Sequence, residues 1–213
     1  MEKFSDLVTS SLRNKTLYRI LFNWQVAEHC QSLKGKTLDL AAGKNPSYYR
    51  YLKGAELTRL DIDYQSKPDE VADLNRKLPW PANKFDNVLF FNAIYILENP
   101  ERAVKECCRV LKFGGFLFLA SPFVFNEAPE PHDYWRFTSE KLKGLIADAG
   151  FSQMEIVPFG GRWTAAVSLI SRFLYFSPIK LIAYWLAIFC DKITKNLLAD
   201  RPCPLGYFCI AKK

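Results

Sequence analysis

Short hydrophobic runs alternate along the chain with an amphipathic segment, and this pattern predicts an α/β fold. Residues 36–42, 86–92 and 116–120 are largely apolar runs that stop at glycine, proline or polar residues, as buried strands do, and residues 57–63 are interpreted as a further strand. Residues 101–111 place their apolar side chains on one helical stripe. Strands separated by helices favour parallel pairing with right-handed crossovers. We therefore expect a doubly wound, mostly parallel seven-stranded sheet.

The remaining segments complete this sheet and cover it. Residues 1–34 carry apolar side chains at helical spacing and predict two helices over a sheet edge. A cap at Thr138 and a stop at Gly150 bound a further helix. The shorter predicted elements are a helix over residues 48–52 and strands over residues 70–74, 151–157 and 205–211. The glycine pair at residues 114–115 is expected to end the helix of residues 101–111 and to introduce the strand that follows.

The turn after the first strand is the first candidate site. Residues 37–46 read Thr-Leu-Asp-Leu-Ala-Ala-Gly-Lys-Asn-Pro, so small residues leave the backbone bare where the strand ends. Ligands of open parallel sheets bind beyond the carboxyl ends of the strands. Asp61 follows Gly43 by 18 residues. This spacing is close to that of the acidic residue that binds ribose hydroxyls in dinucleotide folds.

The amino-acid composition excludes several classes of protein and of site. With 49% hydrophobic and 15% aromatic residues the chain can build a full core, so it is not a disordered protein. Its six cysteines form no CxxC pair, and only one of them, Cys30, stands next to a histidine, His29, so we expect no metal site and no disulfide scaffold, and a cytoplasmic setting. The net charge of +7 favours an anionic partner without identifying it.

Taken in order, these motifs resemble those of the class I S-adenosylmethionine-dependent methyltransferases, most closely the bacterial methyltransferase type 11 group. The resemblance covers residues 36–157 and the final strand. The residues that carry it are 38–43 for the first motif, 60–63 for the ribose motif, 72–74 for the adenine motif, and 84–88 with 109–115 around the fourth and fifth strands.

The resemblance implies a Rossmann-like fold that binds S-adenosylmethionine and releases S-adenosylhomocysteine. The cofactor-binding residues it implies are Asp39, Ala41 and Gly43 for the methionine part, Asp61 and Ile62 for the ribose, Asp73 and Leu74 for the adenine, and Asn92 in the same crevice. From the residues alone, Asp39 could instead cap the turn and Asp73 could be a simple turn residue.

Two departures from the family pattern limit what can be transferred. Asn45 and Pro46 stand where a second glycine is usual, and residues 92–99 lack the histidine that many members carry after the fourth strand. Residues 92–95 also lack the double proline of enzymes that methylate nucleic-acid amines, which makes nucleic acid an unlikely acceptor.

The loop of residues 131–138 is similar to a loop found in one branch of these enzymes, several of which resemble enzymes of surface-glycan or lipid-linked pathways. His132 and Asp133 are the acid/base candidates there, with Tyr134 and Arg136 as orienting partners. The alternative is a structural loop that Asp133 and Arg136 hold against the sheet.

An aromatic-rich stretch over residues 164–190 is the remaining unusual feature. Its longest apolar run, residues 181–190, is shorter than the roughly 20 residues of a membrane span. A helix in a membrane interface, a lid and a homodimer face all suit it. We therefore expect three parts: an N-terminal helical cover over residues 1–34, a cofactor-binding domain over residues 35–161 and 203–213, and a helical insertion over residues 162–202.

These observations predict a cytoplasmic methyltransferase, peripheral at the inner face of the membrane if the insertion binds lipid. Its expected acceptor is a small or lipid-linked molecule, with a glycan hydroxyl as one candidate. In-line methyl transfer needs positioning and proton removal, and no metal. A catalytically silent S-adenosylmethionine-binding or interaction domain is the alternative. A nicotinamide-dependent oxidoreductase is disfavoured because the chain has no GxGxxG motif.

Overall fold

The computed structural model describes residues 2–128, 131–174, 177–194 and 202–213 and contains one seven-stranded sheet. The strand order is β3-β2-β1-β4-β5-β7-β6, and only β7 runs antiparallel to its neighbours. The strands are β1 (Gly35–Leu40), β2 (Ala55–Asp61), β3 (Glu70–Val71), β4 (Phe85–Phe91), β5 (Leu111–Pro122), β6 (Gln153–Phe159) and β7 (Gly206–Lys212). The predicted doubly wound, mostly parallel sheet is confirmed.

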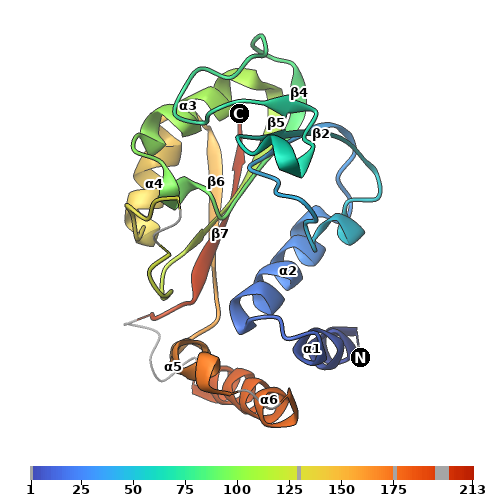
Figure 1. Cartoon of the computed structure of the whole chain (residues 1–213). Coiled ribbons are helices and arrows are strands. Elements are labelled where there is room, and N and C mark those ends of the chain that lie inside the picture. Colours follow the sequence, from blue (N-terminus) through green and yellow to red (C-terminus); the bar gives the residue numbers. More distant parts are fainter. Residues whose placement is uncertain (1, 129–130, 175–176, 195–201) are drawn as a thin grey trace.

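Helices lie on both faces of this sheet and beyond one of its edges (Figure 1). Side-chain oxygens of Thr16, Asn99 and Thr138 accept backbone N–H groups at the starts of α2, α3 and α4, which explains where these helices begin. The helices are α1 (Glu2–Leu12), α2 (Leu17–Cys30), α3 (Pro100–Val110), α4 (Ser139–Asp148), α5 (Arg162–Ile170) and α6 (Ser177–Thr194), with single 3₁₀ turns η1 (Tyr49–Tyr51), η2 (Tyr64–Ser66), η3 (Ile94–Ile96) and η4 (Ser171–Phe173).

Three predicted elements are wrong in detail. The helix expected over residues 48–52 is only the 3₁₀ turn η1, and the strand expected over residues 70–74 has only the two residues of β3. Gly114 and Gly115 lie inside β5, which follows α3 directly. The pairing of β4 with β5 shifts register there, because the glycines let the extra residues of β5 bulge. A Cβ on Gly115 would lie 2.8 Å from the carbonyl oxygen of Asp86.

Alternating side chains of the central strands feed two hydrophobic clusters, one on each face of the sheet. Val88 and Phe90 of β4 pack in the cluster under α3 and α4, whereas Leu89 and Phe91 pack in the cluster under α2. Burial on both faces explains why the strand reads as a continuous apolar run. The core thus fixes the position at which each central strand ends.

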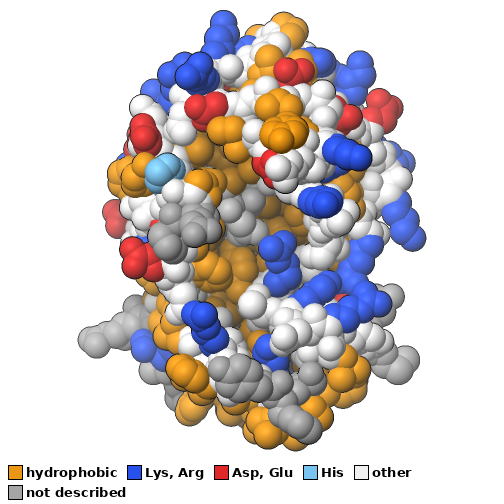
Figure 2. Space-filling view, viewed as in Figure 1, with side chains coloured by type: hydrophobic (Ala, Val, Ile, Leu, Met, Phe, Trp, Pro, Cys, Tyr) orange, Lys and Arg blue, Asp and Glu red, His pale blue; other side chains and the backbone are white. Residues whose placement is uncertain are grey.

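The carboxyl ends of β1, β2, β4, β5 and β6 meet at one edge of the sheet, which we call the carboxyl edge. In Figure 1, α1, α5 and α6 lie below this edge, and α6 packs against both α5 and α1. Figure 2 shows a hollow in the molecule with a hydrophobic floor and Lys and Arg side chains along its lower and right-hand rims. Among the described helices, none is both long and apolar enough to cross a bilayer.

Candidate functional site

The turn after β1 exposes its backbone to open space. Ala41 has a φ of 54° and Gly43 a φ of 66°, so two residues of this short turn adopt the left-handed region. That region costs an L-residue roughly 1–2 kcal/mol, which Ala41 bears and Gly43 avoids. A Cβ placed on Gly43 would meet no atom within 4 Å. The turn therefore leaves room for a ligand to approach its main chain.

Asp61 at the end of β2 supports this turn. One carboxylate oxygen accepts the N–H of Gly43 at 2.8 Å, and the other accepts the N–H of Asp63 at 2.9 Å. A carboxylate has about four acceptor positions, so each oxygen can accept one further hydrogen bond. The structure thus brings Asp61 and Gly43 into direct contact, as their spacing suggested, and leaves acceptor capacity beside the open space.

Arg59 is a site residue that sequence reasoning missed. Its Nη2 donates to the carbonyl oxygen of Gly43 at 2.7 Å and to that of Ser66 at 3.1 Å, which ties the turn after β1 to η2. Residues two apart on a strand point to the same face. A cation two positions before Asp61 was therefore the signal that could have identified it.

Asp39 lies within β1 and is completely buried. Its carboxylate accepts the hydroxyl of Tyr48, with oxygen distances of 2.9 and 3.1 Å. Burial raises the pKa of Asp39 to about 7, although hydrogen bonding by Tyr49 and Tyr48 opposes this shift. Asp39 thus faces the protein interior, and Tyr48, which the sequence did not single out, is its partner.

Asn92 directly follows β4, where it adopts a φ of 56° and donates its N–H to the carbonyl oxygen of Ala120 at 2.9 Å. Its side-chain oxygen accepts the hydroxyl of Tyr18, another residue that sequence reasoning missed. The Tyr18 ring contacts those of Phe125 and Phe159 at centroid distances of 5.5 and 5.3 Å. Asn92 is therefore held at the carboxyl edge by a tyrosine from α2.

The expected adenine-side residues lie next to Asp61. The N–H of Ala72 donates to the carbonyl oxygen of Asp61 at 3.2 Å. Ile62 is 67% exposed, whereas Leu74 is buried. One oxygen of the Asp73 carboxylate accepts the N–H of Asn75 at 2.8 Å, which is a turn-forming contact. The structure therefore offers an exposed apolar side chain and a half-buried carboxylate beyond β2 and β3.

The loop of residues 131–137 is anchored to η3, close behind Asn92. The N–H groups of Tyr134 and Trp135 donate to the carbonyl oxygen of Tyr95 at 3.0 and 3.2 Å. Asp133 forms an ion pair with Arg136, whose guanidinium lies 5.7 Å from the centre of the Tyr95 ring. The Arg136 hydrogen bonds hold the pKa of Asp133 below its usual range. This loop is thus fixed at the carboxyl edge.

His132 occupies a different environment within this loop. It is exposed, and its ring stacks on that of Tyr134 at a centroid distance of 5.3 Å. The oxygens of Asp133 accept hydrogen bonds from Arg136 and from the N–H of Ala128. The four predicted loop residues therefore share one loop, but Asp133 is engaged by Arg136 instead of orienting His132.

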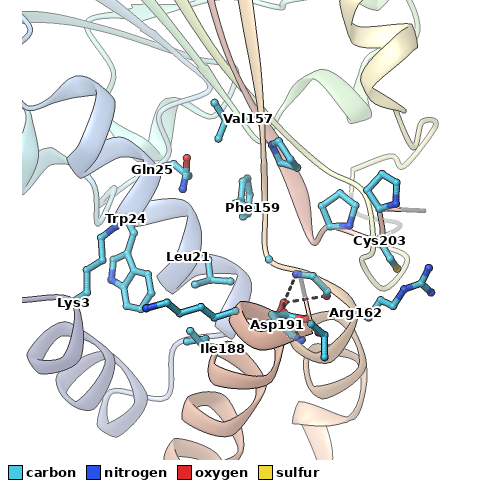
Figure 3. Close-up of a pocket in the computed structure, with 18 residues that line it drawn as sticks. Lys3, Leu21, Trp24, Gln25, Val157, Phe159, Arg162, Ile188, Asp191 and Cys203 are labelled. Atoms are coloured by element: carbon cyan, nitrogen blue, oxygen red, sulfur yellow. Dashed lines mark hydrogen bonds between the residues drawn. The ribbon is translucent and has the colours of Figure 1, made fainter. Parts of the chain in front are cut away.

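A mainly apolar cavity of about 540 Å³ lies between α2, the end of β6 and the α5–α6 segment (Figure 3). Leu21, Trp24 and Gln25 of α2 line it opposite Val157 and Phe159 of β6. The Gln25 side-chain oxygen is buried and has no hydrogen-bond partner among the described residues. Because the ring of Phe159 also contacts that of Tyr18, the cavity lies one aromatic layer from Asn92.

Comparisons with known proteins agree with this geometry. A family model described as a methyltransferase domain matches residues 38–119. The phosphatidylethanolamine N-methyltransferase of Cereibacter sphaeroides is 24% identical over 146 residues, which span 58% of this chain and 72% of the relative. A ubiquinone/menaquinone biosynthesis C-methyltransferase of Chromobacterium violaceum is 34% identical over 83 residues, 37% of this chain and 32% of the relative.

A solved structure shares the whole architecture. A SAM-dependent methyltransferase from Archaeoglobus fulgidus superposes with a TM-score of 0.63 at 16% identity, covering 92% of this chain and 94% of the other. At that identity the likeness shows the fold.

Proposed function

Because this chain belongs to the class I S-adenosylmethionine-dependent methyltransferases of the type 11 group, we propose that it methylates a small or lipid-linked acceptor at the carboxyl edge. S-adenosylmethionine is its methyl donor. The observation that carries the acceptor proposal is the apolar cavity that lies one aromatic layer from Asn92.

The described residues suit the donor. Gly43 borders open space where the methionine part would lie, together with Ala41 and the supporting carboxylate of Asp39. Asp61 has free acceptor positions for two ribose hydroxyls. The exposed Ile62 offers an apolar surface for the adenine ring, and Asp73 with Leu74 would flank it. Asn92 would line the same crevice.

When bound, S-adenosylmethionine supplies an activated methyl group on a positively charged sulfur. The work left to the protein is to align an acceptor atom with that methyl group, to exclude water and to accept a proton where the acceptor carries one. In the described loop of residues 131–137, neither His132 nor Tyr134 forms an ion pair, and His132 would take the proton because imidazole is the better base at neutral pH. Tyr134 and Arg136 would hold the loop in place.

The names of the relatives fit an apolar acceptor. Phosphatidylethanolamine and the quinones named for the two relatives are lipids, and an apolar cavity can hold the chain of such a molecule. A glycan hydroxyl on a lipid carrier would enter in the same way.

Contact with a membrane surface through α6 forms part of this proposal. Its exposed apolar side chains form one face, in which the rings of Trp185 and Phe189 stack at 5.5 Å. The exposed cation Lys192 lies three residues after Phe189 on the same helix. An apolar helix face with a cation beside it suits the interface of an anionic bilayer. A lid and a homodimer face are the competing roles.

Vesicle sedimentation separates these roles. We expect the protein to bind phosphatidylglycerol vesicles at low salt, and the double variant Trp185→Ser/Phe189→Ser to lose that binding. Phe113→Ser is the matched control, because Phe113 is 83% exposed and lies in the bulge of β5, away from the carboxyl edge. No vesicle binding by the native protein would overturn the membrane role, and a dimer that dissociates in the double variant would favour the homodimer.

Methyl transfer itself is tested with S-adenosylmethionine labelled in the methyl group and a cell extract. We expect label to enter the organic phase of a lipid extraction. Label found only in the aqueous phase would overturn the lipid-linked acceptor, and calorimetric binding of the donor without any transfer would favour a silent domain. Calorimetry with NAD tests the nicotinamide-dependent oxidoreductase, and we expect it to show no binding.

A further inference from the structure

A second cavity, of about 390 Å³, opens at the carboxyl edge between the α1–α2 turn, the segment after β5 and the insertion. We call it the basic pocket and define it by Asn14, Phe125, Ser171, Arg172 and Lys180, which lie in its wall. Two cations therefore face one cavity, and the described residues that line it include no carboxylate.

Lys180 is the unusual member of this wall. It is only 8% exposed, and its Nζ donates to the side-chain oxygen of Asn14. Burying an ammonium group is unfavourable unless a negative charge or several hydrogen bonds compensate it. The amide of Asn14 is neutral, and no carboxylate of the described residues forms an ion pair with Lys180. A negative charge on a bound ligand would compensate the charge of the Lys180 ammonium group.

Arg172 lies across the same cavity, in η4. The described part of the chain provides it with no hydrogen-bond or ion-pair partner, so its five N–H donors are available. Thr16, Ser168 and Ser171 also line the cavity, and the Ser171 hydroxyl donates to the carbonyl oxygen of Ser168 at 2.7 Å. Two cations match a phosphate group, which presents three acceptor oxygens and up to two negative charges.

The basic pocket lies close to the reaction site. The ring of Phe125, in its wall, contacts that of Tyr18 at 5.5 Å, and the Tyr18 hydroxyl donates to Asn92. One layer of aromatic side chains therefore separates the pocket from the residue expected to line the methyl-donor crevice. A group anchored in the pocket would fix the distance and direction of an acceptor atom that reaches past this layer.

We propose that the basic pocket binds the phosphate group of the methyl acceptor, as a free phosphate ester or as a lipid headgroup. This inference rests on the proposed function, since it names the chemistry of the acceptor. It assigns Lys180 and Arg172 as the residues that select a phosphorylated acceptor, a role that neither the motifs nor the family resemblance suggests.

Calorimetry tests whether the basic pocket binds phosphate, using the full chain with S-adenosylhomocysteine present. Glycerol 3-phosphate and inorganic phosphate are the soluble probes, and acetate is the singly charged comparison. We expect glycerol 3-phosphate to bind, and Lys180→Met and Arg172→Gln each to weaken it about tenfold. Lys105→Gln is the matched control, because it removes the same charge from an exposed position of α3, outside both the basic pocket and the apolar cavity. If Lys180→Met does not fold, Arg172→Gln carries the test, since Arg172 is exposed.

Vesicles of phosphatidylcholine with and without phosphatidylglycerol distinguish the two sources. Binding only to the vesicles, with the same loss in Lys180→Met and Arg172→Gln, would assign the pocket to a lipid headgroup. Equal binding in all variants, acetate binding as strong as that of the phosphates, or binding of no probe would overturn the proposal. S-adenosylmethionine affinity is measured separately, so that loss of donor binding beside intact phosphate binding would count against the proposed function alone.

Discussion

The hydroxyl of Tyr48 donates its hydrogen bond to the carboxylate of Asp39, inside the protein and out of contact with water. Asp39 lies on β1 and Tyr48 immediately precedes η1, so this bond closes the segment that includes Gly43 back onto its strand. The rings of Phe22 and Phe91 pack against Tyr48 and exclude water from the pair. A carboxylate in such a place links the folding of the donor turn to pH.

Asp39→Asn should remove a pH dependence of stability. Burial raises the pKa of Asp39 from 3.8 to about 7 in the folded protein, so between these values the folded state binds more protons than the unfolded state. Stability from this group is complete below pH 4 and is lost as pH rises to 7, by at most about 4 kcal/mol. At pH 8 the free energy of unfolding of Asp39→Asn should therefore exceed that of the native protein. Urea denaturation from pH 4.5 to 8 should show this difference shrinking as pH falls.

Tyr48→Phe should lower the free energy of unfolding at high pH, where Asp39→Asn should raise it. Without the donor, ionised Asp39 loses a hydrogen bond worth about 1.5–3 kcal/mol, and its pKa rises further. The variant should therefore be least stable, relative to the native protein, at pH 8, with a smaller deficit at pH 5. A deficit independent of pH would show that the hydroxyl supports packing and does not stabilise the charge.

The residues of the turn could be predicted from the sequence, whereas their partners could not. Gly43 and Asp61 occupy positions fixed by strand ends, and local pattern reveals strand ends. Tyr48, Tyr18 and Arg59 reach the site from other elements, and which side chains meet depends on packing across the sheet. The bulge at Gly115 could not be predicted for the same reason, since it depends on the close approach of the Asp86 carbonyl and on no property of the helix before it.

Arg136→Gln should destabilise the loop behind Asn92. The side chain of Asp133 is 3% exposed, and removing Arg136 leaves this carboxylate with the N–H of Ala128 as its described donor and without a counter-charge, a change that typically costs about 3–5 kcal/mol. Lys141→Gln is the matched control, because the Lys141–Glu101 pair is exposed and such pairs contribute about 0–1 kcal/mol. Thermal unfolding of both variants compares the two pairs, and equal small losses would show that Asp133 becomes hydrated.

His132→Ala should lower methyl transfer far more than S-adenosylmethionine affinity. The side chain is exposed, and in the part of the chain that the structure describes its ring stacks on Tyr134 alone, so its removal should change the free energy of unfolding by less than about 0.5 kcal/mol. Steady-state kinetics and calorimetry on the same preparation check this prediction. Equal losses of transfer and donor affinity would assign the histidine to the shape of the loop.

Gly43→Ala and Ala41→Gly should separate the shape of the donor turn from its contact with the donor. Both positions have a left-handed φ, so a new methyl group on Gly43 costs roughly 1–2 kcal/mol of stability. Removing the methyl group of Ala41 recovers part of such a cost. The new methyl group on Gly43 would also extend into the open space where the donor is expected.

We therefore expect Gly43→Ala to weaken S-adenosylmethionine binding at least tenfold, beyond its effect on folding, and Ala41→Gly to leave binding near that of the native protein. Calorimetry below the unfolding temperature of each variant makes the comparison. Unchanged donor affinity in folded Gly43→Ala would place the donor away from this turn.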